Sequence, residues 1–179
     1  MLQIRKSIFE TNSSSSHAIV IKKESSAPEA KVDPKWRLDE EGMLVLYGND
    51  LEFGRTPFEL LIDWFGRLRY AIASLNDIEP FIDICKRHVI GFKGFQFERQ
   101  TSLWDEEEDS EPCYGYVDHQ SADLLAKFLN TKDVTLEDFV FNDRYIVVID
   151  GDEYNILDDF INTGLLDENA VEDIVEALS

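Results

Sequence analysis

Cysteines are rare in this chain, and long apolar runs are missing. Cys85 and Cys113 are the only two cysteines among 179 residues, which is typical of a reducing compartment and leaves room for at most one disulfide. No apolar segment approaches the roughly 20 residues that a membrane-spanning helix requires. The opening residues, MLQIRKSIFETNSSSSH, contain no apolar core of a signal peptide. We therefore expect a cytoplasmic protein that does not bind membranes.

Basic residues are also scarce, above all in the second half of the chain. The sequence has 17 Lys and Arg against 37 Asp and Glu, a net charge of −20. Residues 1–102 carry −1, residues 103–132 carry −6 and residues 133–179 carry −13. Such a surface repels phosphate backbones and attracts basic protein surfaces. We expect no direct binding to nucleic acid by this half. The alternative is an acidic surface that only keeps the protein soluble.

The charge pattern leads to a first hypothesis, an interaction protein that binds a basic host partner. The contacts would come from the most acidic stretches of the second half. Their carboxylates are those of Asp105, Glu106, Glu107, Glu108, Asp109, Asp158, Asp159, Glu172, Asp173 and Glu176. A homo-oligomer stays open, because nothing in the sequence bears on the number of copies.

The apolar content predicts a single α+β domain over residues 1–179. Hydrophobic residues make up 44% of the chain and aromatic residues 12%, which is enough for one filled core. Periodicity predicts a mixed or antiparallel sheet with hairpins, packed against several helices. Strands are expected at 2–9, 17–22, 43–47, 92–98, 114–118, and at 145–149 in a hairpin with 153–156. Helices are expected at 56–75, 77–89, after Ser121, after Thr135, at 158–162 and after Asp167. Mobile loops are expected at about 24–35 and 103–112.

The helix expected to begin at Thr56 has the clearest start signal. Thr56 and Glu59 have the spacing of a capping box, and Pro57 stands at the first helical position, where its missing N–H costs nothing. Apolar residues then recur at helical spacing as far as Leu75.

A dense polar cluster precedes the strand expected at 17–22. It consists of Glu10, Thr11, Asn12, Ser13, Ser14, Ser15 and Ser16, and His17 follows. A hydroxyl beside an imidazole can supply a nucleophile and its general base. Because neighbours in a strand point to opposite faces, the pair would join a serine from 13–15 with His17, or with His119. A polar turn between two strands explains the same residue types.

Two further constellations use the histidines. His17, His119 and Asp118 with Glu10 would make an acid–base or metal pocket of a small hydrolase or transferase. Cys85, His88, Cys113 and His119 have the donor set of a tetrahedral zinc site. Cys85 also lies on the apolar stripe of its expected helix, where a free cysteine is usually part of the core. We expect no cofactor, with zinc as the alternative.

The segment from Arg5 to His17, Arg-x-x-x-Phe-Glu-Thr-Asn-Ser-Ser-Ser-Ser-His, resembles the opening of a group of small phage and prophage proteins. Tyr116–Ser121 and Asp150–Tyr154 are similar to shorter stretches of the same group. That group has no settled biochemical activity. The resemblance therefore implies an origin in a phage or mobile element and a place in bacterial cytoplasm, and it implies no mechanism. The sequence leaves open whether the protein is an enzyme.

Overall fold

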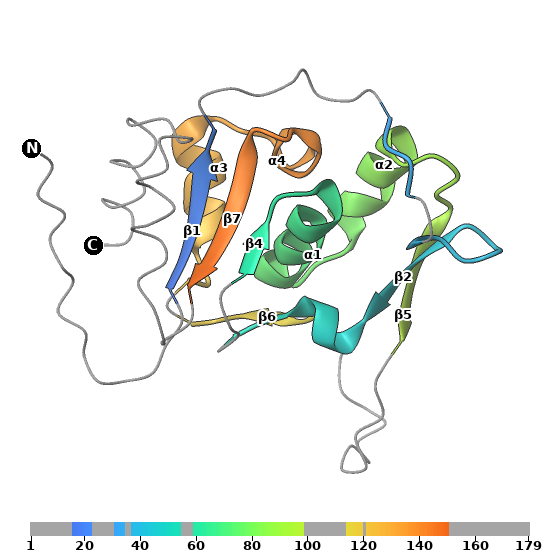
Figure 1. The fold of residues 1–179 in the computed structure, drawn as a ribbon, viewed down its shortest axis with the longest axis horizontal. Helices are drawn as coiled ribbons and strands as arrows, with labels where there is room; N and C mark the ends of the chain where they lie inside the picture. The colour runs from blue at the N-terminus through green and yellow to red at the C-terminus, as the bar shows by residue number, and fades with distance from the viewer. Residues whose placement is uncertain are drawn as a thin grey trace, which may run out of the picture.

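The computed structural model describes residues 16–22, 31–34, 37–54, 59–98, 114–119 and 121–150. Within these ranges four helices and three small sheets make a mixed α+β fold, which confirms the predicted fold class (Figure 1). No helix in the described ranges is long and apolar enough to cross a bilayer.

The largest sheet is antiparallel and has the order β1-β7-β4. Its strands are β1 (Ser16–Ile21), β7 (Tyr145–Asp150) and β4 (Glu59–Leu61). The central strand β7 is an uninterrupted apolar run in which Val147, Val148 and Ile149 are fully buried, as expected for a strand covered on both faces. The predicted strands at 17–22 and 145–149 are confirmed. The second arm of the predicted hairpin, 153–156, lies outside the described residues, as do 2–9 and the helices expected at 158–162 and after Asp167.

Two small sheets each contain one parallel pair. β2 (Met43–Tyr47) pairs with β5 (Gly94–Glu98), and β3 (Glu52–Phe53) pairs with β6 (Tyr116–Val117). The short 3-10 helix η2 (Gly48–Leu51) joins β2 to β3. Figure 1 shows β2 and β5 on the side of α1 away from the large sheet, and β6 beneath the lower ends of β1 and β7.

Four helices complete the core: α1 (Trp64–Leu75), α2 (Glu79–His88), α3 (Leu124–Lys132) and α4 (Leu136–Phe141). α1 supplies many of the buried side chains. The predictions of α2, and of a helix beginning after Thr135, are confirmed. The Thr135 side chain accepts a hydrogen bond from the Asp138 backbone N–H at 3.1 Å.

The predicted start of the helix at Thr56 is wrong. Residues 55–58 lie outside the described residues, and Glu59–Leu61 form β4, an edge strand paired with β7. The helix begins at Trp64, and Asp63 is its N-cap, accepting a hydrogen bond from the Gly66 backbone N–H at 2.7 Å. Pairing with an apolar neighbouring strand outweighs the local capping signal, because helix propensity is a weak local preference.

Of the segment expected to be a loop at about 24–35, the structure describes residues 31–34. Val32 is buried and forms a parallel bridge with Val89. Its backbone N–H donates to the His88 carbonyl at 2.7 Å, and its carbonyl accepts from the Ile90 N–H at 3.1 Å. This end of the segment is therefore fixed against the end of α2. Residues 103–112 lie outside the described residues.

One basic residue, Arg67 of α1, is buried inside the fold. Its guanidinium donates to the carbonyls of Ile62 at 2.7 Å, Val140 at 3.0 Å and Tyr145 at 3.1 Å. Burial lowers the pKa of Arg67 to about 10, and the charges of Asp63 and Asp143 oppose that shift. Arg67 thus ties α1 to α4 and β7 by donating to backbone carbonyls of three separate segments.

Candidate functional site

Buried polar residues gather at the start of β1. His17 has no solvent exposure, Ser121 is 2% exposed and Asp118 is 8% exposed. The His17 backbone N–H donates to the Ser121 hydroxyl at 3.2 Å. On the other side, the Nδ1 atom of His17 is hydrogen-bonded to the hydroxyl of the fully buried Tyr70 at 3.2 Å. We call His17, Tyr70, Asp118, His119 and Ser121 the His17 cluster.

A turn after β6 positions the acidic member of the cluster. The Asp118 backbone N–H donates to the Phe53 carbonyl at 2.9 Å, and the Asp118 carbonyl accepts from the Ser121 N–H at 2.8 Å. Ser121 was predicted to cap a helix, and this prediction is wrong. The N-cap of α3 is Asp123, without a side-chain hydrogen bond, because the Ser121 hydroxyl is engaged by β1.

Burial sets the protonation state of the cluster. It lowers the pKa of His17 to about 4, and the negative charge of Asp118 opposes this shift only in part. Burial also raises the pKa of Tyr70 well above that of a free phenol. At neutral pH the interior of the cluster is therefore a neutral imidazole bonded to a neutral phenol.

His119 occupies the outer side of the cluster. Its side chain is 83% exposed, and its Nδ1 atom lies 3.4 Å from Oδ1 of Asp118. The Asp118 carboxylate thus acts electrostatically on a buried imidazole and an exposed one. A carboxylate beside an imidazole orients the ring, which is an arrangement that proton transfer uses.

Three motifs that are far apart in the sequence meet at this end of the large sheet. The motif that ends at His17 contacts the motif Tyr116–Ser121 through the hydrogen bond to Ser121. The register of β1 and β7 pairs Ser16 with Asp150, where the third motif begins. Ser16 and Asp150, at the described ends of the first and third motifs, are therefore partners across the β1–β7 pair.

Comparison with protein-family models, curated proteins and solved structures finds no match.

The structure brings together only part of the predicted catalytic set. His17, Asp118 and His119 are neighbours, whereas Glu10, Ser13, Ser14 and Ser15 lie outside the described residues. Sequence reasoning missed Tyr70, which is 53 positions from His17. Its only signal was a hydroxyl-bearing ring on the helix α1, and that signal does not identify a partner.

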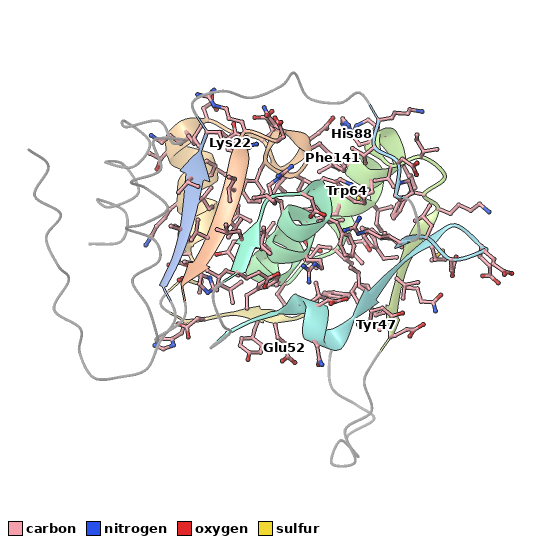
Figure 2. All side chains as sticks on the ribbon, viewed as in Figure 1. Lys22, Tyr47, Glu52, Trp64, His88 and Phe141 are labelled. Atoms are coloured by element: carbon pink, nitrogen blue, oxygen red, sulfur yellow. The ribbon has the colours of Figure 1, made fainter. Side chains whose placement is uncertain are left out.

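The predicted zinc ligands have other surroundings where they are described. Cys85 is fully buried, and burial raises the pKa of its thiol to about 12. The Nε2 atom of His88 lies 2.6 Å from Oε1 of Glu137, and its ring stacks on Phe141 with centroids 4.5 Å apart. Figure 2 shows His88, Phe141 and Trp64 close together above α1. Cys113 lies outside the described residues. Within the described ranges no three His, Cys, Asp or Glu side chains could hold a metal together, and the four-residue site stays a prediction.

Proposed function

We propose that this protein is a phage-type acidic accessory protein that binds a basic protein of its bacterial host in the cytoplasm. A role in host takeover or in countering a host defence follows from such binding. The observation that carries the proposal is the charge of residues 103–179, which hold three of the 17 basic residues and 22 of the 37 acidic ones. An excess of this size attracts basic surfaces over about a Debye length.

Among the described residues, four of the six ion pairs of Lys or Arg join residues of the first half. Arg37 pairs with Asp63, Arg69 with Asp50 and Glu59, and Lys86 with Asp83, all within the first half. Two described ion pairs of Lys or Arg cross between the halves, Lys22 with Asp143 and Arg87 with Glu137. Within the described part of the chain, two ion pairs of Lys or Arg therefore offset charge of the second half. The ten predicted partner-binding carboxylates, Asp105, Glu106, Glu107, Glu108, Asp109, Asp158, Asp159, Glu172, Asp173 and Glu176, lie outside the described residues.

The test is capture of a defined host protein by the full chain. The tagged protein is incubated with bacterial lysate at low ionic strength, bound proteins are eluted with rising salt, and each is identified by mass spectrometry. We expect a protein of high isoelectric point that elutes as salt screens the charges. Recombinant partner is then titrated against the chain to give a Kd.

A matched pair of variants separates a specific site from net charge. One variant neutralises the five carboxylates of residues 105–109 as Asn or Gln. The control neutralises five exposed acids of the first half: Asp33, Glu40, Glu41, Asp77 and Glu79. We expect the first variant to weaken the Kd for the partner and the control to leave it nearly unchanged. Equal weakening by both variants, or the absence of any basic partner at low salt, contradicts the proposal.

The second candidate is a small hydrolase or transferase, favoured by the position of the Asp118 carboxylate between His17 and His119. In this proposal His119 transfers the proton, Asp118 orients it, and a serine from 13–15 is the nucleophile. Activity is measured on p-nitrophenyl acetate and p-nitrophenyl phosphate. We expect His119→Gln to lower kcat by about a hundredfold or more, and the control His88→Gln to leave it unchanged. Equal rates for His119→Gln and the wild type exclude this candidate.

A further inference from the structure

Each of the two small parallel sheets places an exposed tyrosine beside an exposed glutamate. Tyr47 is in register with Glu98 in the sheet of β2 and β5, and Glu52 is in register with Tyr116 in the sheet of β3 and β6. Residues in register on adjacent strands are about 5 Å apart and point to the same face. Tyr47 is 46% exposed and Tyr116 is 51% exposed, and both glutamates are exposed. Each of the two sheets therefore presents a tyrosine ring and a glutamate carboxylate side by side on an exposed face.

The two pairs belong to one region of the surface. The short helix η2 connects Tyr47 directly to Glu52, and Figure 2 shows both residues along the lower edge of the molecule. The rings of Phe97 and Tyr114 lie 5.0 Å apart. This contact links the end of β5, which carries Glu98, to the residues that lead into β6, which carries Tyr116.

The two glutamates of these pairs differ from other acidic residues of the first half in their ion pairing. Among the described residues, neither Glu52 nor Glu98 forms an ion pair, whereas Glu59 and Asp63 pair with arginines. The side chain of Glu98 receives only a long hydrogen bond of 3.5 Å from Gln96. Their negative charge therefore remains available to a cation from outside.

An exposed aromatic ring beside a carboxylate suits one kind of side chain best. A guanidinium is flat, so it stacks on the ring, and its N–H groups donate two parallel hydrogen bonds to the carboxylate. A lysine ammonium is a compact and strongly hydrated charge that does not combine both contacts as well. We propose that the Tyr47–Glu98 and Tyr116–Glu52 pairs form a docking surface for arginine side chains of the basic partner. This inference depends on the proposed function and adds where the partner binds and which residue type it presents.

The first experiment uses a fluorescent peptide of alternating arginine and glycine, with a lysine and glycine peptide of equal length as its counterpart. Binding to the full chain is measured by fluorescence anisotropy at physiological ionic strength. We expect the arginine peptide to bind more tightly. Tyr47→Leu and Tyr116→Leu leave the net charge unchanged, and each weakens the Kd for the arginine peptide about two- to fivefold. The same substitutions weaken the Kd for the lysine peptide less.

The second experiment separates these glutamates from the general negative field. The double variant Glu52→Gln, Glu98→Gln is compared with Glu40→Gln, Glu41→Gln, which removes the same charge from exposed positions elsewhere in the first half. Circular dichroism confirms that every variant is folded. We expect only the first pair to remove the preference for arginine. The docking surface is overturned if the tyrosine variants bind the arginine peptide as tightly as the wild type and both double glutamate variants weaken its Kd equally. If the chain still captures a basic host protein in that case, the proposed function stays intact. If the wild-type chain binds neither peptide nor any basic host protein at low salt, the proposed function fails as well.

Discussion

The Nδ1 atom of His17 lies 3.2 Å from the hydroxyl oxygen of Tyr70, and both side chains are fully buried. β1 and α1 are thereby joined by a hydrogen bond between two neutral polar groups inside the core. A buried hydrogen bond of this kind contributes little in itself, but removing one of its two groups costs more, because a polar atom inside the core loses a hydrogen bond.

Replacing Tyr70 with Phe should therefore destabilise the fold. The ring is preserved and the hydroxyl is removed, so the Nδ1 atom of His17 loses this hydrogen bond at almost constant volume. We expect the free energy of unfolding to fall by about 1–3 kcal/mol, measured by urea unfolding. The control Tyr116→Phe changes a half-exposed tyrosine and should stay within about 0.5 kcal/mol of the wild type. Similar effects of the two substitutions contradict the role assigned to Tyr70.

The stability of the protein should depend on pH through His17. Its pKa is about 4 in the folded chain and takes the ordinary value of 6.5 in the unfolded chain. Between these values the unfolded chain binds a proton that the folded chain does not, so the free energy of unfolding falls as the pH falls from 6.5 toward 4. The His17 contribution to this loss is about 3 kcal/mol. Above pH 6.5 it is constant.

A His17→Gln variant isolates this contribution, because it removes the imidazole and keeps every other ionisable side chain. Urea unfolding at a series of pH values should show that the free energy of unfolding falls more steeply in the wild type than in the variant between pH 6.5 and pH 4. Parallel curves contradict the assignment of a depressed pKa to His17.

Replacing Arg67 with Met should be among the most damaging single changes. The carbonyls of Ile62, Val140 and Tyr145 lose their donor, and each buried unsatisfied group costs about 1–3 kcal/mol. We expect the free energy of unfolding, measured with urea, to fall by at least about 3 kcal/mol. Arg69→Met removes a partly exposed arginine that pairs with Asp50 and Glu59, and should cost roughly 1 kcal/mol. A smaller effect at Arg67 than at Arg69 contradicts the structural role.

Replacing Gly115 with Ala should loosen β6, the strand that leads to Asp118 and Ser121 of the His17 cluster. Gly115 has a φ of +99°, and a Cβ atom would lie 2.2 Å from the Leu51 carbonyl oxygen. Because that obstacle is backbone, β6 has to move away from η2. We expect a lower Tm, and faster hydrogen exchange at the amides of Asp118 and Ser121 measured by NMR. The control Gly48→Ala places its Cβ in open space and should change neither quantity.

Local sequence determined the identity of most described elements. The strands at 17–22, 43–47 and 145–149 are apolar runs bounded by polar or glycine positions, and the helix of residues 79–88 shows a regular apolar stripe. These signals are strong because alternation and helical periodicity follow directly from which face of an element is buried. The same reasoning gave His17, Asp118 and His119 as candidates, since their residue types carry acid–base chemistry wherever they lie.

Only the tertiary structure decided how these elements pair and which polar groups meet. Nothing local in Glu59–Leu61 distinguishes a helical turn from a strand, and the edge of β7 makes it a strand. The hydroxyls of Ser121 and Tyr70 are 104 and 53 positions from His17 in the sequence, and only strand pairing and helix packing bring them within hydrogen-bond reach. The sequence by itself therefore determined the fold class, the charge of each half and the candidate residues. Contacts between distant segments decided the rest, because burial in a core favours specific pairings that local preferences are too weak to predict.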